Sequence, residues 1–244
     1  MMLKKWFVPL FALPLLLGAA DLYLAGDSTM CDYSKNRAPL TGWGTALKAL
    51  VKPGVQVTNL AMGGRSSKSF LTENRWDKIL DKAKPGDFVI IQFGHNDAHV
   101  GPKNTYRHTS ADETYKHYLK IYIAEARANG LIPVLCTQTA ICKFETDGAV
   151  REHGSTYIRA CRDVARETGC DFVDLNLIAR EKLAAMGPDA GRKLYMFLAP
   201  EEFPAYPKGR EDSCHLRDAG AEFYAREFVT QAREKKLKIA GLFQ

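Results

Sequence analysis

The chain has 244 residues, of which 46% are hydrophobic and 25% are charged, and this length and composition fit one α/β domain with a full-sized core. Its formal net charge is +6. That charge is too small for the basic surface that nucleic-acid binding requires, so we expect no nucleic-acid partner. A mildly basic surface would suit an acidic polysaccharide. The sequence contains no internal repeat or low-complexity segment.

The first twenty residues have the three parts of a secretory signal peptide. Residues 4 and 5 are lysines, residues 6–17 are apolar but too few to span a bilayer, and residues 18–20 are small. We expect cleavage after about Ala20, which leaves a mature chain of residues 21–244 that is secreted or periplasmic and not associated with a membrane. Cleavage would leave 32 basic and 28 acidic residues, a net charge of +4. An uncleaved membrane anchor is the alternative.

Six cysteines follow that segment, and their spacing shows neither a C-x-x-C pair nor a zinc pattern. They are Cys31, Cys136, Cys142, Cys161, Cys170 and Cys214. Export would permit disulfide bonds, and Cys161 with Cys170, or Cys136 with Cys142, would close short loops. Buried free thiols are the alternative. The sequence gives no reason to expect a metal or an organic cofactor.

Predicted strands and helices alternate along the rest of the chain. The predicted strands are residues 22–25, 55–59, 88–93, 131–136 and 172–174. The predicted helices are residues 43–52, 75–84, 110–128, 151–168, 177–186 and 216–236, and Ser110 with Glu113 forms a capping box at the start of the third. Such alternation is typical of an α/β fold, a five-stranded parallel sheet between two helical layers.

Right-handed connections leave few strand orders for such a sheet, and the flavodoxin-like order 2-1-3-4-5 is the one we expect. In that order the carboxyl ends of the first three strands are neighbours. Ligands bind beyond these ends, at the point where the strand order reverses. The loops after the first three strands should therefore carry the functional residues.

Each of these loops holds a residue that acyl-transfer chemistry could use. Gly26 allows a sharp exit from the first strand, and the hydroxyl of Ser28 follows it. Paired glycines after the second strand, Gly63 and Gly64, can aim a backbone N–H at an oxyanion, and the Asn96 amide after the third is a neutral donor. Each alone also fits a turn or a helix cap. Their joint placement favours one catalytic site.

Near the C-terminus, Asp212 precedes His215 by three residues, a spacing that lets a carboxylate orient an imidazole. With Ser28, these residues would supply the nucleophile, base and orienting acid of acyl transfer to water. The alternative is that Asp212 and Ser213 only cap the last predicted helix. We expect the pair to lie in a loop that folds back over the sheet edge.

These segments resemble the four sequence blocks of the SGNH (GDSL) hydrolases, and most closely the rhamnogalacturonan acetylesterases. The matching words are Tyr-Leu-Ala-Gly-Asp-Ser-Thr-Met at 23–30, Gly-Trp-Gly at 42–44, Gly-Gly-Arg-Ser-Ser at 63–67, Gln-Phe-Gly-His-Asn-Asp at 92–97 and Asp-x-x-His at 212–215. The resemblance covers the mature chain as a single domain. Where the family often has Asp-Asn-Thr-His, this chain has Asp-Ser-Cys-His, which places Cys214 beside the expected base.

The resemblance implies a role for each matching residue. Ser28 corresponds to the nucleophile, His215 to the base and Asp212 to the acid that orients it. The N–H groups of Ser28 and Gly64 and the side-chain amide of Asn96 correspond to the oxyanion hole. The other two block members, Asp27 and His95, are expected to be structural.

As a whole, the resemblance implies a secreted serine esterase that removes acetyl groups from an acidic plant cell-wall polysaccharide, rhamnogalacturonan first, and we expect it to be a monomer. The alternatives are esterases acting on xylan or peptidoglycan acetyl groups, a lysophospholipase or thioesterase, and a catalytically silent carbohydrate-binding protein. Loop position makes Arg65, Lys208 and Arg210 candidates for binding an acidic sugar, followed by Lys103 and Lys143. Residues 196–210, rich in aromatic residues and prolines, would form a stiff wall beside the sugar; an ordinary surface loop is the alternative.

Overall fold

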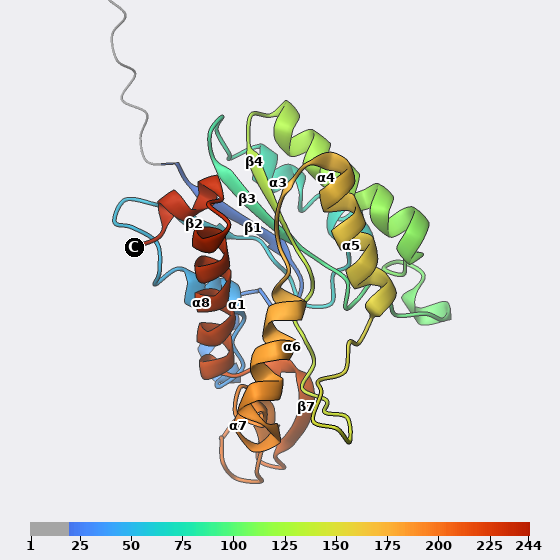
Figure 1. The fold of residues 1–244 in the computed structure, drawn as a ribbon, viewed down its shortest axis with the longest axis vertical. Coiled ribbons are helices and arrows are strands. Elements are labelled where there is room, and N and C mark those ends of the chain that lie inside the picture. The colour runs from blue at the N-terminus through green and yellow to red at the C-terminus, as the bar shows by residue number, and fades with distance from the viewer. Residues whose placement is uncertain (1–19) are drawn as a thin grey trace, which may run out of the picture.

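A computed structural model describes residues 20–244, so the expected signal peptide lies outside the described residues apart from Ala20. A five-stranded parallel sheet forms the centre of the molecule, with the order β2-β1-β3-β4-β5 (Figure 1). Its strands are β1 (Leu22–Gly26), β2 (Val57–Asn59), β3 (Phe88–Gln92), β4 (Ile132–Cys136) and β5 (Asp171–Val173). The predicted fold class and the predicted strand order are therefore confirmed.

One face of the sheet packs on a core made with helices from both ends of the chain. Successive strand residues point to opposite faces, so Leu22 and Leu24 of β1 share this core with Ile90 of β3. Trp43 and Phe228, both fully buried, come from the helices that cover it. These helices are α1 (Trp43–Leu47), α6 (Leu175–Met186) and α8 (Asp218–Glu234).

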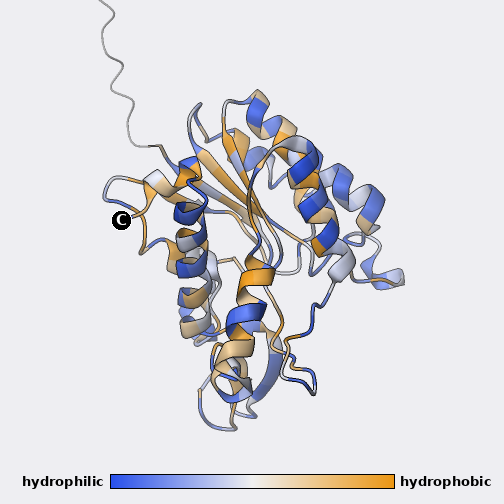
Figure 2. Cartoon of the chain, in the orientation of Figure 1, coloured by the Kyte–Doolittle hydropathy of each residue, from blue (hydrophilic) through white to orange (hydrophobic). Residues whose placement is uncertain are grey.

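The opposite face packs on a second core. Tyr23 of β1 and Val89 and Ile91 of β3 point to this side, where they meet the buried rings of Trp76 and Tyr122. The covering helices are α2 (Ser67–Thr72), α3 (Asp77–Leu80), α4 (Lys116–Ala128) and α5 (Ser155–Thr168). Figure 2 shows mostly hydrophobic strands between helices that carry both hydrophobic and hydrophilic residues.

The strand register brings the loops after β1 and β3 side by side. Gly26, the last residue of β1, pairs with Gln92, the last residue of β3, and Leu24 pairs with Asn59 at the end of β2. The chain segments that follow these three strands therefore leave the sheet at the same edge, as predicted.

The main departure from the prediction is a β-hairpin beyond this edge. After α7 (Pro188–Arg192), an antiparallel pair is formed by β6 (Tyr195–Leu198) and β7 (Arg210–Leu216), where a loop was expected. Asp212 and His215 therefore lie on a strand and not in a loop. β7 has the sequence Arg-Glu-Asp-Ser-Cys-His-Leu, in which polar residues hide the apolar pattern that identifies strands.

Some predicted helices are also shorter than expected. The helix expected at 43–52 ends at Leu47, and that at 75–84 is reduced to α3. The N-terminal part of the helix expected at 110–128 is a π-helical turn, Ala111–Tyr115, in which the Ser110 hydroxyl accepts from the backbone N–H of Thr114. The predicted capping box paired Ser110 with Glu113, whereas the observed cap pairs Ser110 with Thr114, one residue later.

The six cysteines all lie in the described residues and are free thiols. The free-thiol alternative is thus the one that the structure supports. Burial is the main reason that the pKa of Cys31 and of Cys142 rises to about 11, so both thiols are protonated near neutral pH. Within residues 20–244, no helix combines the length and the apolar character that crossing a membrane requires.

Candidate active site

The hairpin brings Ser28, Asp212 and His215 into one hydrogen-bonded row. Nε2 of His215 lies 3.0 Å from Oγ of Ser28, and Nδ1 of His215 lies 2.7 Å from Oδ2 of Asp212. An ionised carboxylate can only accept, so Nδ1 carries a proton and donates it to Asp212. In the neutral imidazole, Nε2 then has a free lone pair toward the Ser28 hydroxyl. This is the geometry in which an imidazole acts as a general base.

Asp212 is held ionised by its neighbours. Its Oδ1 accepts from the backbone N–H groups of Cys214 at 2.9 Å and His215 at 3.0 Å. Burial favours the neutral acid, but the hydrogen bonds from the His215 ring and amide and from the Cys214 amide outweigh it and hold the pKa of Asp212 well below its usual range. Its negative charge is therefore available near neutral pH to stabilise a protonated His215.

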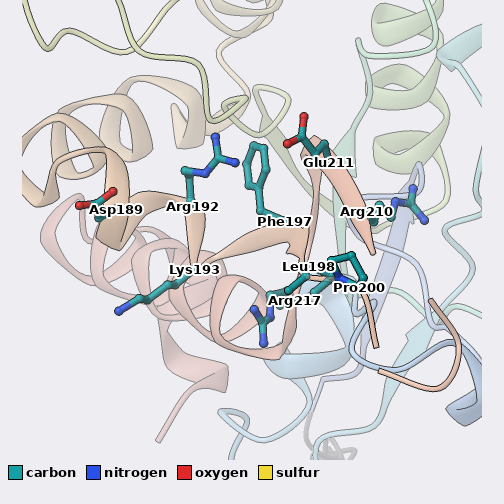
Figure 3. Close-up of a pocket in the computed structure, with 10 residues that line it drawn as sticks. Asp189, Arg192, Lys193, Phe197, Leu198, Pro200, Arg210, Glu211 and Arg217 are labelled. Carbon is teal, nitrogen blue, oxygen red and sulfur yellow. The ribbon is translucent and has the colours of Figure 1, made fainter. Parts of the chain in front are cut away.

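Arg210 has a different position from the one expected for a substrate-binding residue. Its Nε and Nη2 lie 3.1 and 2.5 Å from Oδ2 of Asp212, the oxygen that also accepts from His215. Figure 3 shows Arg210 at the edge of a separate hollow, which Phe197 and Glu211 also line. The volume of this hollow is about 580 Å³. The guanidinium is thus paired with the acid of the row, so it supports the orientation of Asp212 instead of facing the cleft of Ser28.

Replacing Arg210 with glutamine is expected to lower kcat on a small acetate ester about tenfold and to leave KM unchanged. A hydrogen bond to a charged group contributes about 1.5–3 kcal/mol, and part of it would be lost from the orientation of Asp212. Steady-state kinetics with p-nitrophenyl acetate provide the measurement, with Lys208→Met as the exposed control. A higher KM for an acidic acetylated oligosaccharide at unchanged kcat would instead restore the substrate-binding role.

A chain of buried hydrogen bonds holds the turn that carries Ser28. Oδ1 of Asp27 accepts from the backbone N–H and the hydroxyl of Thr29, at 2.9 and 2.8 Å. Gln92 donates to the Thr29 hydroxyl at 2.9 Å and accepts from the Trp43 indole N–H at 2.5 Å. Asp27 is fully buried and is not among the residues that line the cleft of Ser28. Its contacts match the structural role expected of it.

The segment before α1 packs on the same turn. A Cβ atom on Gly42 would lie 2.2 Å from the carbonyl oxygen of Cys31, so only glycine fits there. The Tyr33 hydroxyl donates to the carbonyl oxygen of Ser28 at 2.8 Å. Both contacts fix the backbone of the turn, and with it the direction of the serine side chain.

Ser28, Gly64 and Asn96 line the same cleft, whose volume is about 660 Å³. Gly64 has φ = +80°, a left-handed conformation that favours glycine, and no atom lies within 4 Å of the position that its Cβ would take. Nδ2 of Asn96 donates to the carbonyl oxygen of Arg65 at 3.0 Å. One of the two amide hydrogens of Asn96 remains for a ligand. The structure thus brings the three predicted donors of an oxyanion hole to one cleft.

The orientation of the Asn96 amide is determined by two contacts. Nη1 of Arg107 donates to Oδ1 of Asn96 at 3.0 Å. A guanidinium can only donate and a backbone carbonyl can only accept. The oxygen of Asn96 therefore faces Arg107, and the nitrogen faces Arg65.

The other predicted basic residues lie away from this cleft. Arg65 donates from Nε to Glu73 at 2.9 Å and from Nη1 to the carbonyl oxygen of Gly63 at 2.9 Å, so it braces the glycine loop. The three lysines proposed for substrate binding are exposed and outside the cleft: Lys103, Lys143 and Lys208. The arginines that line the cleft are Arg37 and Arg107. The sequence prediction missed both because neither belongs to a motif.

Two further side chains, next to Ser28, Asp212 and His215, have pKa values that are shifted mainly by burial. His95, expected to be structural, contacts the Thr139 hydroxyl at 3.0 Å through Nε2 and the Cys214 thiol at 3.9 Å through Nδ1. Burial lowers the pKa of His95 and raises that of Cys214. A neutral imidazole and a protonated thiol therefore lie next to His215.

Asp97 connects the glycine loop to the Asn96 loop, a role that the sequence prediction missed. It is fully buried, and its Oδ1 accepts from the backbone N–H of Ser67 at 3.1 Å, from the Ser67 hydroxyl at 2.5 Å and from the Thr109 hydroxyl at 3.1 Å. Burial raises the pKa of Asp97 to about 7, although the bonds from Ser67 and Thr109 oppose the rise; the charge of Asp27 adds to it.

This pKa predicts that Asp97 makes stability depend on pH. In the unfolded chain its pKa is about 3.9, so between about pH 4 and pH 7 the folded state binds more protons than the unfolded state. Its contribution to the free energy of unfolding therefore decreases as pH rises through this range. Asp97→Asn should flatten that decrease. Urea unfolding of both proteins at pH 5 and pH 7.5 measures the difference, and an identical pH dependence in the variant would contradict the prediction.

The class of protein follows from the fold and this site. An α/β fold in which a serine–histidine–aspartate row lies beside backbone and asparagine amide donors has the form of a serine hydrolase. The sequence model of the GDSL-like lipase/acylhydrolase family matches residues 24–223. The chain belongs to this family, which makes it a carboxylic ester hydrolase by class. The resemblance seen in the sequence is thus confirmed.

Individual members of the family are also similar to this chain in sequence or in structure. The chain is 34% identical over 201 residues to the rhamnogalacturonan acetylesterase RhgT of Bacillus subtilis, covering 82% of this chain and 84% of RhgT. It is 37% identical over 224 residues to YesY of the same organism, named a probable rhamnogalacturonan acetylesterase, covering 91% of this chain and 96% of YesY. The crystal structure of B. subtilis YxiM superposes with a TM-score of 0.77 at 26% identity, covering 90% of this chain and 57% of that one.

Proposed function

We propose that this protein is a secreted esterase that removes acetyl groups from an acidic plant cell-wall polysaccharide, rhamnogalacturonan in the first instance. The observation that carries the proposal is the 3.0 Å contact between Oγ of Ser28 and Nε2 of His215, in line with the carboxylate of Asp212. The choice of substrate is supported by the similarity to two B. subtilis proteins, one named a rhamnogalacturonan acetylesterase and the other a probable one. Secretion rests on residues 1–20 of the sequence.

In the first half of the proposed reaction, Oγ of Ser28 attacks the acetyl carbonyl carbon, and Nε2 of His215 takes the hydroxyl proton. Asp212 stabilises the imidazolium through the bond to Nδ1. The oxygen of the tetrahedral intermediate is stabilised by the N–H groups of Ser28 and Gly64 and by Nδ2–H of Asn96. The bond to the sugar oxygen then breaks, and His215 returns the proton to that oxygen, which leaves as a hydroxyl.

The second half repeats these steps with water. His215 takes a proton from a water molecule, whose oxygen attacks the carbonyl carbon of the acetyl group on Ser28. The same three donors hold the second oxyanion. Its collapse releases acetate and returns the proton from His215 to Oγ of Ser28, which restores the starting state.

The residues that line the cleft favour a small acyl group on a polar alcohol. Most of the residues that line it have polar or charged side chains, among them Asp32, Tyr33, Arg37, His99 and Arg107. A long acyl chain would need an apolar channel to bury it. A lysophospholipase or long-chain thioesterase is therefore less well supported than an acetylesterase.

Acetate release from defined polymers tests the proposal. The purified protein is incubated with acetylated rhamnogalacturonan and with acetylated xylan, and p-nitrophenyl acetate is compared with p-nitrophenyl decanoate. We expect acetate from rhamnogalacturonan faster than from xylan, and hydrolysis of the acetate ester but not of the decanoate. Ser28→Ala serves as the control. A folded protein that releases no acetate from either polymer would contradict the proposal and favour a silent carbohydrate-binding protein.

A further inference from the structure

Arg107 reaches into the cleft of Ser28 and His215 from the turn that follows a short 3₁₀ helix, Pro102–Asn104. Two other arginines near the site are neutralised, since Arg65 pairs with Glu73 and Arg210 with Asp212. Arg107 forms no ion pair with a carboxylate of residues 20–244. It therefore brings an uncompensated positive charge to the cleft wall.

Neutral oxygen atoms hold the guanidinium in place. Oδ1 of Asn104 accepts from Nε at 2.9 Å and from Nη2 at 2.6 Å, and Oδ1 of Asn96 accepts from Nη1 at 3.0 Å. These bonds use three of the five N–H donors of an arginine, and one remains on each terminal nitrogen. The side chain is thus fixed before a ligand arrives, with its charge and two donors still unused. Preorganisation of this kind lowers the cost of binding.

Arg107 lies close to where the acyl group of a substrate would bind. It bonds directly to Asn96, the proposed oxyanion donor, so a substrate group beside Arg107 lies close to the ester that is cleaved. The charge also acts on the cleft, because burial and then the Arg107 charge lower the pKa of His99, another residue that lines it. The other arginine of the cleft, Arg37, is exposed and stacks on the Tyr33 ring at 5.0 Å.

We propose that Arg107 binds a carboxylate of the substrate, so that the site selects acetyl esters on, or next to, a uronic acid. Guanidinium groups bind carboxylates through charge-assisted hydrogen bonds that neutral hydroxyl groups do not match. The inference deepens the proposed function, on which it rests, and assigns recognition of the acidic sugar to a residue outside the family blocks. It replaces the assignment of this role to Arg65, Lys208 and Arg210.

Binding without turnover provides the test. The Ser28→Ala variant is titrated calorimetrically at low salt with acetylated rhamnogalacturonan oligosaccharides and with acetylated xylo-oligosaccharides, which carry no carboxylate. Adding Arg107→Met should weaken the affinity for the acidic ligand at least tenfold and change that for the neutral ligand less than twofold. Adding Lys103→Met instead, which removes the same charge just outside the cleft, should leave both affinities unchanged. Circular dichroism verifies the fold of each variant.

Two results would overturn the assignment: an unchanged affinity for the acidic ligand, or an equal loss for both ligands. The salt dependence of binding is a second test, and it needs no Arg107 variant. The affinity of Ser28→Ala for the acidic ligand should fall as salt rises from 20 to 300 mM, which shortens the Debye length by about a factor of 4. The affinity for the neutral ligand should stay constant. Absence of this difference would also refute the proposal. Failure of acetate release by the parent protein would instead refute the proposed function, because binding does not depend on turnover.

Discussion

Replacing Ser28 with alanine is expected to lower turnover of p-nitrophenyl acetate by roughly 10⁶, the loss that follows when the nucleophile of such a site is removed. The reason is chemical: without Oγ no acyl-enzyme forms. The fold should persist, because Ser28 is only partly buried and its Oγ bonds to His215 alone among the described side chains. Steady-state kinetics and thermal unfolding of the same preparation measure both effects.

Replacing His215 extends this prediction to the general base. His215→Ala should lose about as much activity as Ser28→Ala, and the double variant should lose little more, because a nucleophile and its base act as a unit. If the two losses multiplied, the residues would act independently. If Ser28→Ala retained the parent turnover in a folded protein, the nucleophile would have to be another residue.

Replacing Asn96 with alanine is expected to lower kcat by about 10²–10³ and to leave KM nearly unchanged. The free amide hydrogen of Asn96 would act on the oxygen only when it becomes negatively charged, so its removal destabilises the transition state more than the bound ester. Kinetics with p-nitrophenyl acetate separate the two parameters. A change confined to KM would mean that Asn96 binds the substrate.

A control variant at Asn104 distinguishes the effect of the Asn96 amide from the effect of displacing Arg107. Asn104 accepts from the same guanidinium as Asn96 but does not line the cleft. Asn104→Ala removes an equal side chain from the other side of Arg107 and should cost less than tenfold in kcat. Similar losses in both variants would show that the position of Arg107, and not the Asn96 amide, limits the reaction.

The sheet could be predicted because its strands carry their own signals. The run Phe88–Gln92 is fully buried, and an apolar strand of this kind between turn residues identifies the centre of a parallel sheet. Five such alternations with helices leave few strand orders, and the observed order is the predicted one. The functional loops followed from it, since Ser28, Gly64 and Asn96 come directly after the first three strands.

The hairpin and the supporting contacts could not be predicted in the same way. β7 has polar residues at most positions, Asp212 and His215 among them, so its composition resembles that of a loop. Whether an arginine faces a substrate or a carboxylate depends on which chain segments meet, and the sequence does not show this for Arg210 or Arg107. The buried Asp97 presents the same problem, because its partner Ser67 lies 30 residues away.

The most direct test is covalent labelling of the nucleophile. The protein is treated with a fluorophosphonate, which reacts with a serine hydroxyl activated by a neighbouring base, and the digested peptides are analysed by mass spectrometry. The structure predicts one adduct, on Ser28, and its loss in the His215→Ala variant. An active protein that stays unlabelled, or that carries the adduct on a different serine, would contradict the view that the imidazole at the hairpin activates the hydroxyl at the end of β1.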